Sequence, residues 1–406
     1  EAAFAGCSEL ETIKILANIS SIGPKSFLLC QNLTHVELSS SIKIIKKNAF
    51  QNCRNLTTIK LPENLETIED YGFFFCQNLK LLYIPPKLTT IGDSAFYYTP
   101  SIEEIVVDSN NPKYYSSGKI LFQKEPHSIV YFANKNNVEH YVIPEGIVSI
   151  GDRAFSHCYT LKTITLASTV TEIGEKAFMS CHNLETVTIT AGVTSIGKSL
   201  FLQSSKLKHI IVDPNNKHFI SIDDILFSKD MEEIICYPSA KASVAYTIPS
   251  DIKVIKASAF ANCTNLIKIT APSSLTTIEE NAFTLCYNMK SLEFASPSYL
   301  TTIGQDAFRD CQALEFLVIP QGVTSIGDFA FQNCFTLTSI VIPSTITSFG
   351  QNLFFKDSKI QTISILASDK ESAYRIQKSI RMDIDQFRIF EATEIAYISD
   401  TNSSHF

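Results

Sequence analysis

Cysteine is the residue type in this sequence with the most potential for chemistry. The chain has 11 cysteines among 406 residues, and thiols can form disulfides, bind zinc or act as nucleophiles. All but Cys236 stand three residues after a phenylalanine, and these are Cys7, Cys30, Cys53, Cys76, Cys158, Cys181, Cys263, Cys286, Cys311 and Cys334. Such regular placement indicates positions in a repeat rather than a reactive site.

The spacing of these cysteines argues against both disulfides and zinc. Stacked one strand apart, neighbouring cysteines would be about 5 Å from each other, which is within disulfide range for Cα atoms. Their Cβ atoms would point in parallel, however, and a disulfide needs them turned toward each other. No Cys-x-x-Cys pair occurs. We therefore expect small buried thiols, with solvated histidines at the adjacent pairs His157-Cys158 and Cys181-His182.

Other chemical motifs are lacking in the sequence. There is no Gly-x-Ser-x-Gly, phosphate-binding loop, His-Glu-x-x-His or EF-hand spacing. Acidic pairs such as Asp223-Asp224 are expected to be solvated turn residues, and Asp383 and Asp385 lack the remaining parts of a calcium loop. We expect no catalytic, cofactor-binding or metal-binding residues, no cofactor and no enzyme activity.

A repeat of 23 residues places the cysteines. Its skeleton is Ile-Gly-x-x-Ala-Phe-x-x-Cys-x-x-Leu-x-x-Ile-x-Ile-Pro, with further apolar residues six and nine positions after each phenylalanine. The phenylalanines that mark the thirteen copies are Phe4, Phe27, Phe50, Phe73, Phe96, Phe155, Phe178, Phe201, Phe260, Phe283, Phe308, Phe331 and Phe354. One repeat alone cannot bury these apolar residues, so stacked repeats must form a continuous core.

The repeat predicts an α/β fold, namely a leucine-rich-repeat solenoid that is a right-handed β-α superhelix of about thirteen repeats. The Leu-x-x-Ile-x-Ile segment has the composition of a strand, and Ala-Phe-x-x-Cys suits one helical turn. One strand per 20–29 residues is typical of leucine-rich repeats. We expect the strands to line a concave parallel sheet and the phenylalanine turns to form the convex back.

Two insertions interrupt the repeat, at about residues 108–147 and 213–252. Each carries two apolar runs around a polar turn, which predicts a β-hairpin in place of the phenylalanine turn. We call these segments the first and second island. Thr99 and Ser204 replace the cysteine in the repeats that lead into them, which indicates a local change in packing.

The repeat ends near residue 366, so we predict a solenoid over 1–366 and a C-terminal cap or linker over 367–406. Residues 368–382 read as a helix that Ser368 or Asp369 begins, and 387–390 and 395–398 read as short strands. A terminal cap is what an open solenoid end requires.

Composition excludes some partners. The net charge is −7, without the basic blocks that nucleic-acid binding needs. No apolar run approaches the roughly 18 residues of a membrane span. We therefore expect protein ligands, with glycans as an additional class, and neither nucleic acid nor membrane contact by this segment.

The repeat resembles the Treponema pallidum-type leucine-rich repeat of BspA-like surface proteins. The resemblance covers about nine-tenths of the chain and includes the islands, with Ile120-Leu121-Phe122 and Ile225-Leu226-Phe227 as their common element. It implies an extracellular, cell-surface protein of the kind associated with adhesion to host cells, matrix proteins or other microbes. It implies no catalytic residues.

Candidate binding residues are those that point outward from the predicted sheet or lie in the islands. Leu81 with Tyr83, and Phe316 with Val318, place apolar side chains on the outward face, where they either bind a ligand or are covered by a loop. The other candidates are His209 and Glu37 on the same face and Tyr114, Tyr115 and Phe219 in the islands.

These observations leave two classes of function. The first is a non-catalytic recognition or adhesion protein at the cell surface that binds host or matrix proteins through the concave face and islands. The alternative is an intracellular scaffold for protein–protein interactions, which reduced cysteines would suit.

Overall fold

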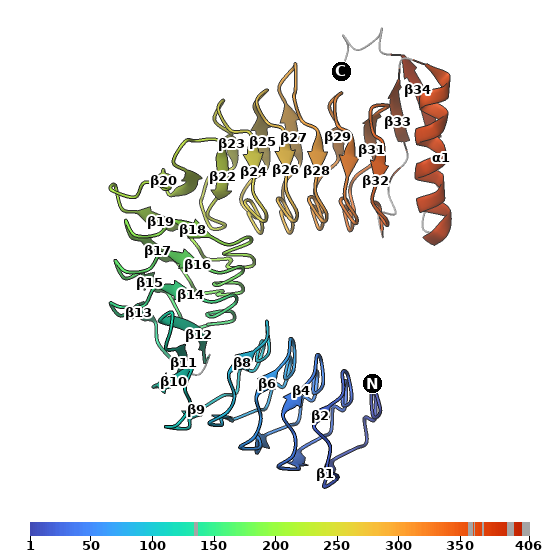
Figure 1. Cartoon of the computed structure of the whole chain (residues 1–406). Coiled ribbons are helices and arrows are strands. Elements are labelled where there is room, and N and C mark those ends of the chain that lie inside the picture. Colours follow the sequence, from blue (N-terminus) through green and yellow to red (C-terminus); the bar gives the residue numbers. More distant parts are fainter. Residues whose placement is uncertain (134–136, 356–359, 361, 368, 388–393, 400–406) are drawn as a thin grey trace. The chain divides into compact units, whose positions relative to one another are not determined.

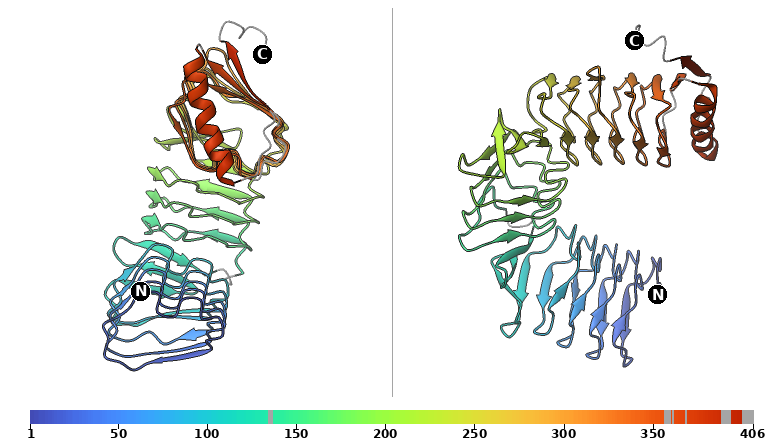
Figure 2. Two further views of the ribbon diagram at one scale, coloured as in Figure 1. Left: turned by 90° about the vertical axis from the view of Figure 1, so that its right-hand side faces the viewer. Right: turned by 45° about the horizontal axis from the view of Figure 1, so that its top comes forward.

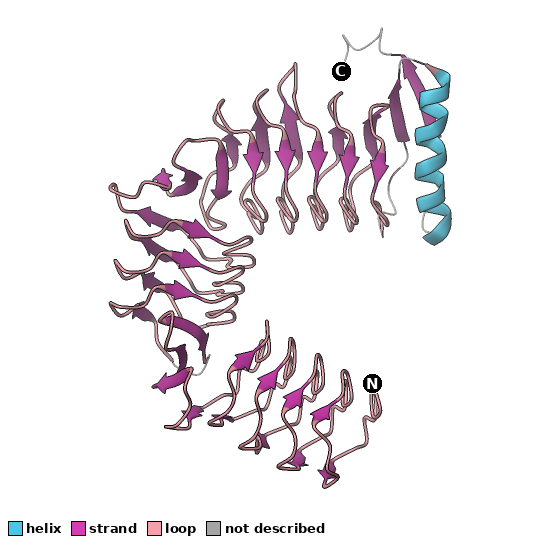
Figure 3. Cartoon of the chain, in the orientation of Figure 1, coloured by secondary structure: helices cyan, strands magenta, loops and turns pink. Residues whose placement is uncertain are grey.

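The chain folds into two compact units of stacked coils. The computed structural model describes residues 1–133, 137–355, 360, 362–367, 369–387 and 394–399. The first unit comprises residues 1–184 and 188–201, and the second comprises 185–187 and 202–406. Strands and turns make up nearly all of the described chain, with a single α-helix near the C-terminus (Figures 1 and 3).

Each coil contains a long strand and a short strand joined by turns. The long strands of the first unit are β1 (Thr12–Ile15), β3 (His35–Leu38), β5 (Thr58–Ile59), β7 (Leu81–Ile84), β9 (Glu104–Val107), β13 (His140–Val142), β15 (Thr163–Thr165) and, at the division between the units, β17 (Thr186–Ile189). The short strands are β2 (Ser21–Ile22), β4 (Ile44–Ile45), β6 (Thr67–Ile68), β8 (Thr90–Ile91), β14 (Ser149–Ile150), β16 (Glu172–Ile173) and β18 (Ser195–Ile196). Within each sheet, strands of one kind pair in parallel with their equivalents in the next coil, and the long-strand ladder is interrupted between β5 and β7 and between β9 and β13.

The pairing keeps equivalent residues of successive coils side by side. In the long strands Ile13 pairs with Val36, and in the short strands Ile22 pairs with Ile45. Because side chains alternate across a strand, Leu82 and Ile84 of β7 point into the core and Leu81 and Tyr83 point outward. The predicted parallel sheet is confirmed, and the short strands form an additional ladder that we did not predict.

The predicted helical turn at each phenylalanine is wrong. In the turn around Phe50, the N–H groups of Ala49, Gln51 and Cys53 donate to carbonyls three residues earlier. Those of Asn48, Phe50 and Asn52 donate to the next coil instead. A helix would need all of these donors to bond four residues back within the same segment. The backbone alternates, with positive φ at Asn48 and Asn52, conformations that asparagine accepts more readily than most residues.

The phenylalanines of successive regular coils stack on one another inside the turns. Phe27 and Phe50 are stacked with their ring centroids 5.2 Å apart, as are Phe50 and Phe73, and all three rings are buried. Aromatic pairs at this separation stabilise beyond the area that they bury. The phenylalanine ladder therefore supplies much of the core.

The cysteines form a second ladder beside the phenylalanines. The thiol of Cys53 donates to the carbonyl of Phe27 at 3.2 Å, and that of Cys76 donates to Phe50 at the same distance. Every cysteine is free, and all except Cys7 are buried. The prediction of small buried thiols is confirmed for these residues, and Cys7 is the exception because it lies in the first coil.

Glycine before the turn permits the close approach of the coils. A Cβ atom on Gly174 would lie 2.5 Å from the backbone nitrogen of Asp152 in the preceding coil. The carboxylate of Asp152 there accepts the N–H of Glu175 at 2.6 Å. Glycine thus allows an especially close approach at this position, although other coils stack with lysine or glutamate there, such as Lys46 and Glu69.

The islands contain the predicted hairpins and one strand more. In the first island β10 (Tyr114–Ser117), β11 (Ile120–Gln123) and β12 (Ser128–Phe132) pair antiparallel in sequence order, and β12 then pairs in parallel with β14. In the second island β20 (Phe219–Ile222), β21 (Ile225–Ser228) and β22 (Glu233–Cys236) repeat this order, and β22 pairs with β24 (Val254–Ile255). Each island therefore joins the short-strand ladder.

An aromatic residue from each island also continues the phenylalanine ladder. Phe132 stacks on Phe155 at 4.7 Å, and Tyr237 stacks on Phe260 at 5.3 Å. The N–H of Phe132 donates to Ala154, as the ladder phenylalanines do to the next coil. Each island is therefore a modified coil, so the prediction of about thirteen repeats is too low and the solenoid has about fifteen turns. Thr99 confirms the altered packing, since its hydroxyl lies 3.0 Å from that of Tyr131 in the island.

The second unit has the same plan. Its long strands are β19 (His209–Val212), β23 (Ala245–Thr247), β25 (Lys268–Ala271), β27 (Ser291–Phe294), β29 (Phe316–Val318), β31 (Ser339–Pro343) and β33 (Thr362–Ala367). The remaining short strands are β26 (Thr277–Ile278), β28 (Thr302–Ile303), β30 (Ser325–Ile326) and β32 (Ser348–Phe349).

The C-terminal segment contains the predicted helix and a strand. Helix α1 (Lys370–Phe387) begins at Asp369, whose carboxylate accepts the N–H of Ser372 at 2.8 Å. Ala373 and Ile376 join the core of the last coil, and α1 lies beside β33 at the end of the unit (Figure 2). β34 (Glu394–Ser399) pairs in parallel with β33 and covers the strand predicted at 395–398. The strand predicted at 387–390 falls largely outside the described residues, and the boundary between solenoid and cap stays a prediction.

The phenylalanine ladder predicts a large effect of truncation in mid-solenoid. Phe178→Ala removes a fully buried ring and should lower the free energy of unfolding by about 3–5 kcal/mol because of the cavity that it leaves. Denaturant titration measures this difference. Phe335→Ala, at an exposed phenylalanine, is the control and should change stability little. A loss at Phe178 as small as at Phe335 would contradict the ladder.

The thiol ladder predicts selective alkylation. Burial raises the pKa of the Cys286 thiol to about 12, so it offers almost no thiolate at neutral pH, and thiolate is the reactive form. Mass spectrometry should find native protein alkylated at Cys7 alone, and unfolded protein alkylated at every cysteine without reductant. A disulfide between Cys30 and Cys53 would overturn this assignment.

Candidate functional site

A groove of about 840 Å³ lies on the outward face of the long strands in the first unit. Residues of β3, β5, β7 and β9 form most of it, and the turns after β3 and β5 add the rest. The lining residues are His35, Val36, Glu37, Leu38, Ser40, Thr58, Ile59, Lys60, Leu61, Pro62, Glu63, Leu81, Tyr83, Glu104 and Val106. Three predicted binding residues, Glu37, Leu81 and Tyr83, therefore share one groove.

Strand register places an apolar surface at one end of the groove. Leu81 pairs with Glu104, and Tyr83 pairs with Val106, so these four side chains lie on one patch of the sheet. Leu81 is 36% exposed and Val106 is 37% exposed. Accessible apolar side chains in a concave site are typical of binding surfaces.

The hydroxyl of Tyr83 lies between two carboxylates. It is 3.3 Å from Oε1 of Glu63 and 3.3 Å from Oδ2 of Asp108. Desolvation by burial, followed by the negative charges of Glu63 and Asp108, raises the pKa of Tyr83 to about 12. The hydroxyl therefore stays protonated at neutral pH and donates its one proton to one carboxylate at a time.

Charge is distributed unevenly along the groove. Glu37 forms an ion pair with Lys14 at 3.0 Å, and Lys60 lies in the next coil at the equivalent position. Within the described chain, Glu63 and Glu104 form no ion pair. The end of the groove around Leu81 and Val106 is therefore acidic as well as apolar.

The predicted residues of the second unit lie outside this groove. Phe316 is 44% exposed and Val318 is half-buried, both on β29. The imidazole Nδ1 of His209 lies 3.1 Å from a carboxylate oxygen of Asp224, so one of the acidic residues expected to be solvated has a partner.

The island aromatics are less accessible than predicted. Tyr114 is only 3% exposed, so its expected exposure is wrong. The Asn111 side chain accepts the N–H of Tyr114 at 2.8 Å, and the ring packs into the core of the first unit. Tyr115 is half-buried and stacks on Phe122 at 4.9 Å. Phe219, at the equivalent place in the second island, is also half-buried.

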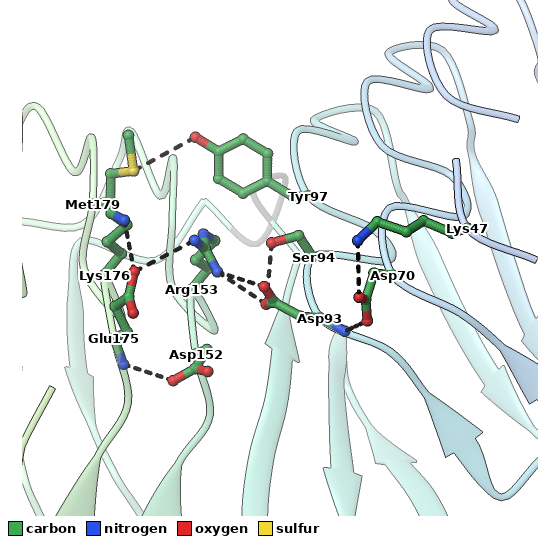
Figure 4. Close-up of polar contacts among 10 residues, drawn as sticks. All are labelled: Lys47, Asp70, Asp93, Ser94, Tyr97, Asp152, Arg153, Glu175, Lys176 and Met179. Carbon is green, nitrogen blue, oxygen red and sulfur yellow. Dashed lines mark hydrogen bonds and ion pairs between the residues drawn. The ribbon is translucent and has the colours of Figure 1, made fainter. Parts of the chain in front are cut away.

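A polar network joins the turns on either side of the first island (Figure 4). Arg153 pairs with Asp93 at 2.9 Å and with Glu175 at 3.6 Å, although Asp93 and Arg153 are 60 residues apart. The hydroxyl of Tyr97 also donates to the sulfur of Met179 at 3.6 Å. The island has no phenylalanine turn of its own, so the flanking turns close the gap.

This closure reverses the predicted curvature at the first island. The phenylalanine turns on either side of the island approach one another. These turns therefore lie on the inner side of the bend (Figure 1). The long-strand sheet lies on the outer side. The expectation of a concave sheet with convex turns is therefore wrong at this bend.

His157 lies at the centre of the closed bend. It is 7% exposed, and its Nε2 and Nδ1 atoms lie 2.8 Å from the hydroxyl of Tyr97 and 2.9 Å from that of Tyr159. The prediction of a solvated histidine is thus wrong for His157, whereas His182 is exposed. Burial, and then the charge of His182, lowers the pKa of His157 to about 4.

Sequence reasoning missed several residues of these two regions. Phe132 stands 23 residues before Phe155, and Tyr237 stands 23 before Phe260, so the period itself could have located them. Glu63 and Asp108 lie after strands, where the repeat carries no signal. The pairing of Asp93 with Arg153 depends on a contact across the island that spacing does not reveal.

The part of the chain that the structure describes shows neither a metal-ion cluster nor a membrane-spanning helix. It contains no group of three or more histidine, cysteine or acidic side chains arranged to hold a metal ion. None of its helices is both long and apolar enough to cross a membrane.

Stacked coils with a continuous core and an outward-facing groove define this chain as a repeat solenoid of the protein-binding kind. A sequence model of the BspA type leucine rich repeat region matches residues 1–122, 128–244, 236–361 and 293–379, with six copies. The chain therefore belongs to the BspA-type leucine-rich repeat family. No curated protein matches its sequence.

Solved structures agree with this membership. A leucine rich cell surface protein from Faecalibacterium prausnitzii aligns with a TM-score of 0.57 and 27% identity, covering 90% of this chain and 85% of that one. The pneumococcal vaccine antigen PcpA aligns with a TM-score of 0.55 and 20% identity, covering 98% of this chain and 91% of that one. The second likeness concerns the fold alone.

The burial of His157 predicts an acid-dependent loss of stability. Above pH 6.5 the ring is neutral in both folded and unfolded chains, so pH has no effect through it. Between pH 6.5 and about 4 the unfolded chain takes up a proton that the folded chain does not. Stability should therefore fall by roughly 3 kcal/mol over this range.

Urea titrations of wild type and His157→Gln between pH 7 and 4 measure this dependence. The variant should show a shallower decline, whereas His35→Gln, at an exposed histidine, should keep the wild-type slope. Equal slopes for all three proteins would contradict the assignment of the acid dependence to His157.

Proposed function

We propose that this chain is a non-catalytic recognition protein of the cell surface that binds host or extracellular matrix proteins. The groove on β3, β5, β7 and β9 carries the proposal, because it combines exposed apolar side chains with charged groups in a site large enough for part of a protein. Glycans are the second class of ligand, since protein and sugar can share one such surface.

Family membership supports a protein-binding role. Repeat solenoids bind through extended surfaces to which each repeat contributes a few side chains. The 27% identical relative from Faecalibacterium prausnitzii is described as a cell surface protein, which favours the same location for this chain. Ten of the eleven thiols are buried, so they are protected from oxidation outside the cell and do not require the reducing interior of the scaffold alternative.

Leu81 and Tyr83 are proposed as the main contacts, with Glu37 in the same groove. Aromatic and aliphatic side chains near the centre of an interface tend to contribute most of its free energy. Phe316 and Val318 form a second contact region, and His209, Tyr115 and Phe219 are auxiliary contacts. Tyr114 is left out of the contact set because it is buried.

The test compares binding to cultured host cells and to a panel of immobilised matrix proteins. Leu81→Ala/Tyr83→Ala should weaken binding at least about 10-fold, the order of effect expected for two central contacts. Phe316→Ala/Val318→Ala should have a smaller effect. Tyr374→Ala, at an exposed aromatic residue of α1, is the matched control and should bind as wild type does.

Circular dichroism and thermal unfolding establish that each variant is folded. Undiminished binding by the folded Leu81→Ala/Tyr83→Ala variant would refute the groove as the site. An absence of binding to any extracellular protein by wild type would favour the intracellular scaffold.

A further inference from the structure

We propose that the groove holds an extended segment of the partner protein that carries a lysine or arginine next to an apolar side chain. The cationic head would lie at Glu63 and Asp108 beside Tyr83, with its apolar neighbour on Leu81 and Val106. Glu104, opposite Leu81, would add negative charge at the other end of this apolar surface. This inference rests on the proposed function, because it specifies which part of a protein ligand the groove recognises.

The carboxylates beside Tyr83 have hydrogen-bonding capacity that its hydroxyl alone does not meet. Its hydroxyl lies 3.3 Å from Oε1 and 3.4 Å from Oε2 of Glu63, and 3.3 Å from Oδ2 of Asp108. A tyrosine hydroxyl has one proton, so only one of these two carboxylates receives it at any moment. Asp108 also accepts two hydrogen bonds from Asn110 at its Oδ1, so a guanidinium or ammonium group, which brings several donors, would chiefly satisfy Glu63.

Other carboxylates on the long-strand side differ from those of the groove, because they pair with lysines. Glu139 pairs with Lys162 at 2.7 Å, and in the second unit Glu293 pairs with Lys268 at 2.6 Å. In each case the lysine comes from the adjacent coil. Glu63 and Glu104 lack such a lysine in the part of the chain that the structure describes. Their charge is therefore available to a partner.

An apolar surface lies between these charges. Leu81 lies opposite Glu104 and beside Tyr83, and Val106 lies opposite Tyr83. Lysine and arginine place their aliphatic stems on apolar surface while the charged head reaches polar groups. A groove of about 840 Å³ with this floor fits a peptide segment better than a lone cation.

The test uses two tryptophan-labelled dodecapeptides that alternate valine with either lysine or glutamate. The chain contains no tryptophan, so the emission of the peptide reports binding directly. The lysine peptide should bind the full chain, and its affinity should fall as salt is added, because part of the interaction is between charges. The glutamate peptide should not bind measurably.

Substitutions then locate the interaction. Glu63→Gln and Glu104→Gln should each weaken binding of the lysine peptide up to about 5-fold, the size expected for one partly exposed ion pair. Asp108→Asn should act in the same direction. Glu139→Gln is the matched control, since it removes a carboxylate of the same unit outside the groove, and it should leave the affinity unchanged.

Two results would overturn the inference. One is equal binding of the lysine and glutamate peptides, and the other is unchanged binding of the lysine peptide by Glu63→Gln/Glu104→Gln. Neither result affects the proposed function, which is tested separately by loss of protein binding in Leu81→Ala/Tyr83→Ala.

Discussion

Backbone hydrogen bonds from each coil to the next hold the whole solenoid in register. Both strand ladders and the alternate N–H groups of the phenylalanine turns use equivalent residues of neighbouring coils as partners. Equivalent side chains of successive regular coils therefore stack, which is why phenylalanine, cysteine and isoleucine form columns. The space between coils is so small that Gly174 admits no Cβ atom.

The islands interrupt the repeat but preserve the stacking register of the coils that follow them. Each one replaces the phenylalanine turn by antiparallel strands, yet Phe132 and Tyr237 return an aromatic ring to the column. At the first island the lost turn is compensated by contacts between its neighbours, with Arg153 and His157 as the central residues. The outward groove lies on the long-strand side of the first unit, and the closed bend lies on its turn side.

The period revealed the stacking, the buried thiols and the outward positions from sequence alone, because all three depend on residue spacing. The prediction from the repeat was wrong at the phenylalanine turn, where the composition Ala-Phe-x-x-Cys suits a helix. Hydrogen bonding between coils instead selects alternating backbone conformations, with positive φ at Asn48 and Asn52. Leu81 and Tyr83 were found through their exposed strand positions. Glu63 and Asp108 were not, because their approach to the Tyr83 hydroxyl depends on turn geometry outside the repeat pattern.

The uniform bonding between coils also determines how such a chain can change length. Adding or removing a whole coil of 23 residues would join two surfaces that already match, whereas one extra residue within a strand would misplace every column beyond it. The 25-residue step from Phe283 to Phe308 keeps to this rule, because its two additional residues lie in the connection between β27 and β28. Length in this architecture is therefore adjustable in units of one coil, and the connections between strands are where smaller changes are tolerated.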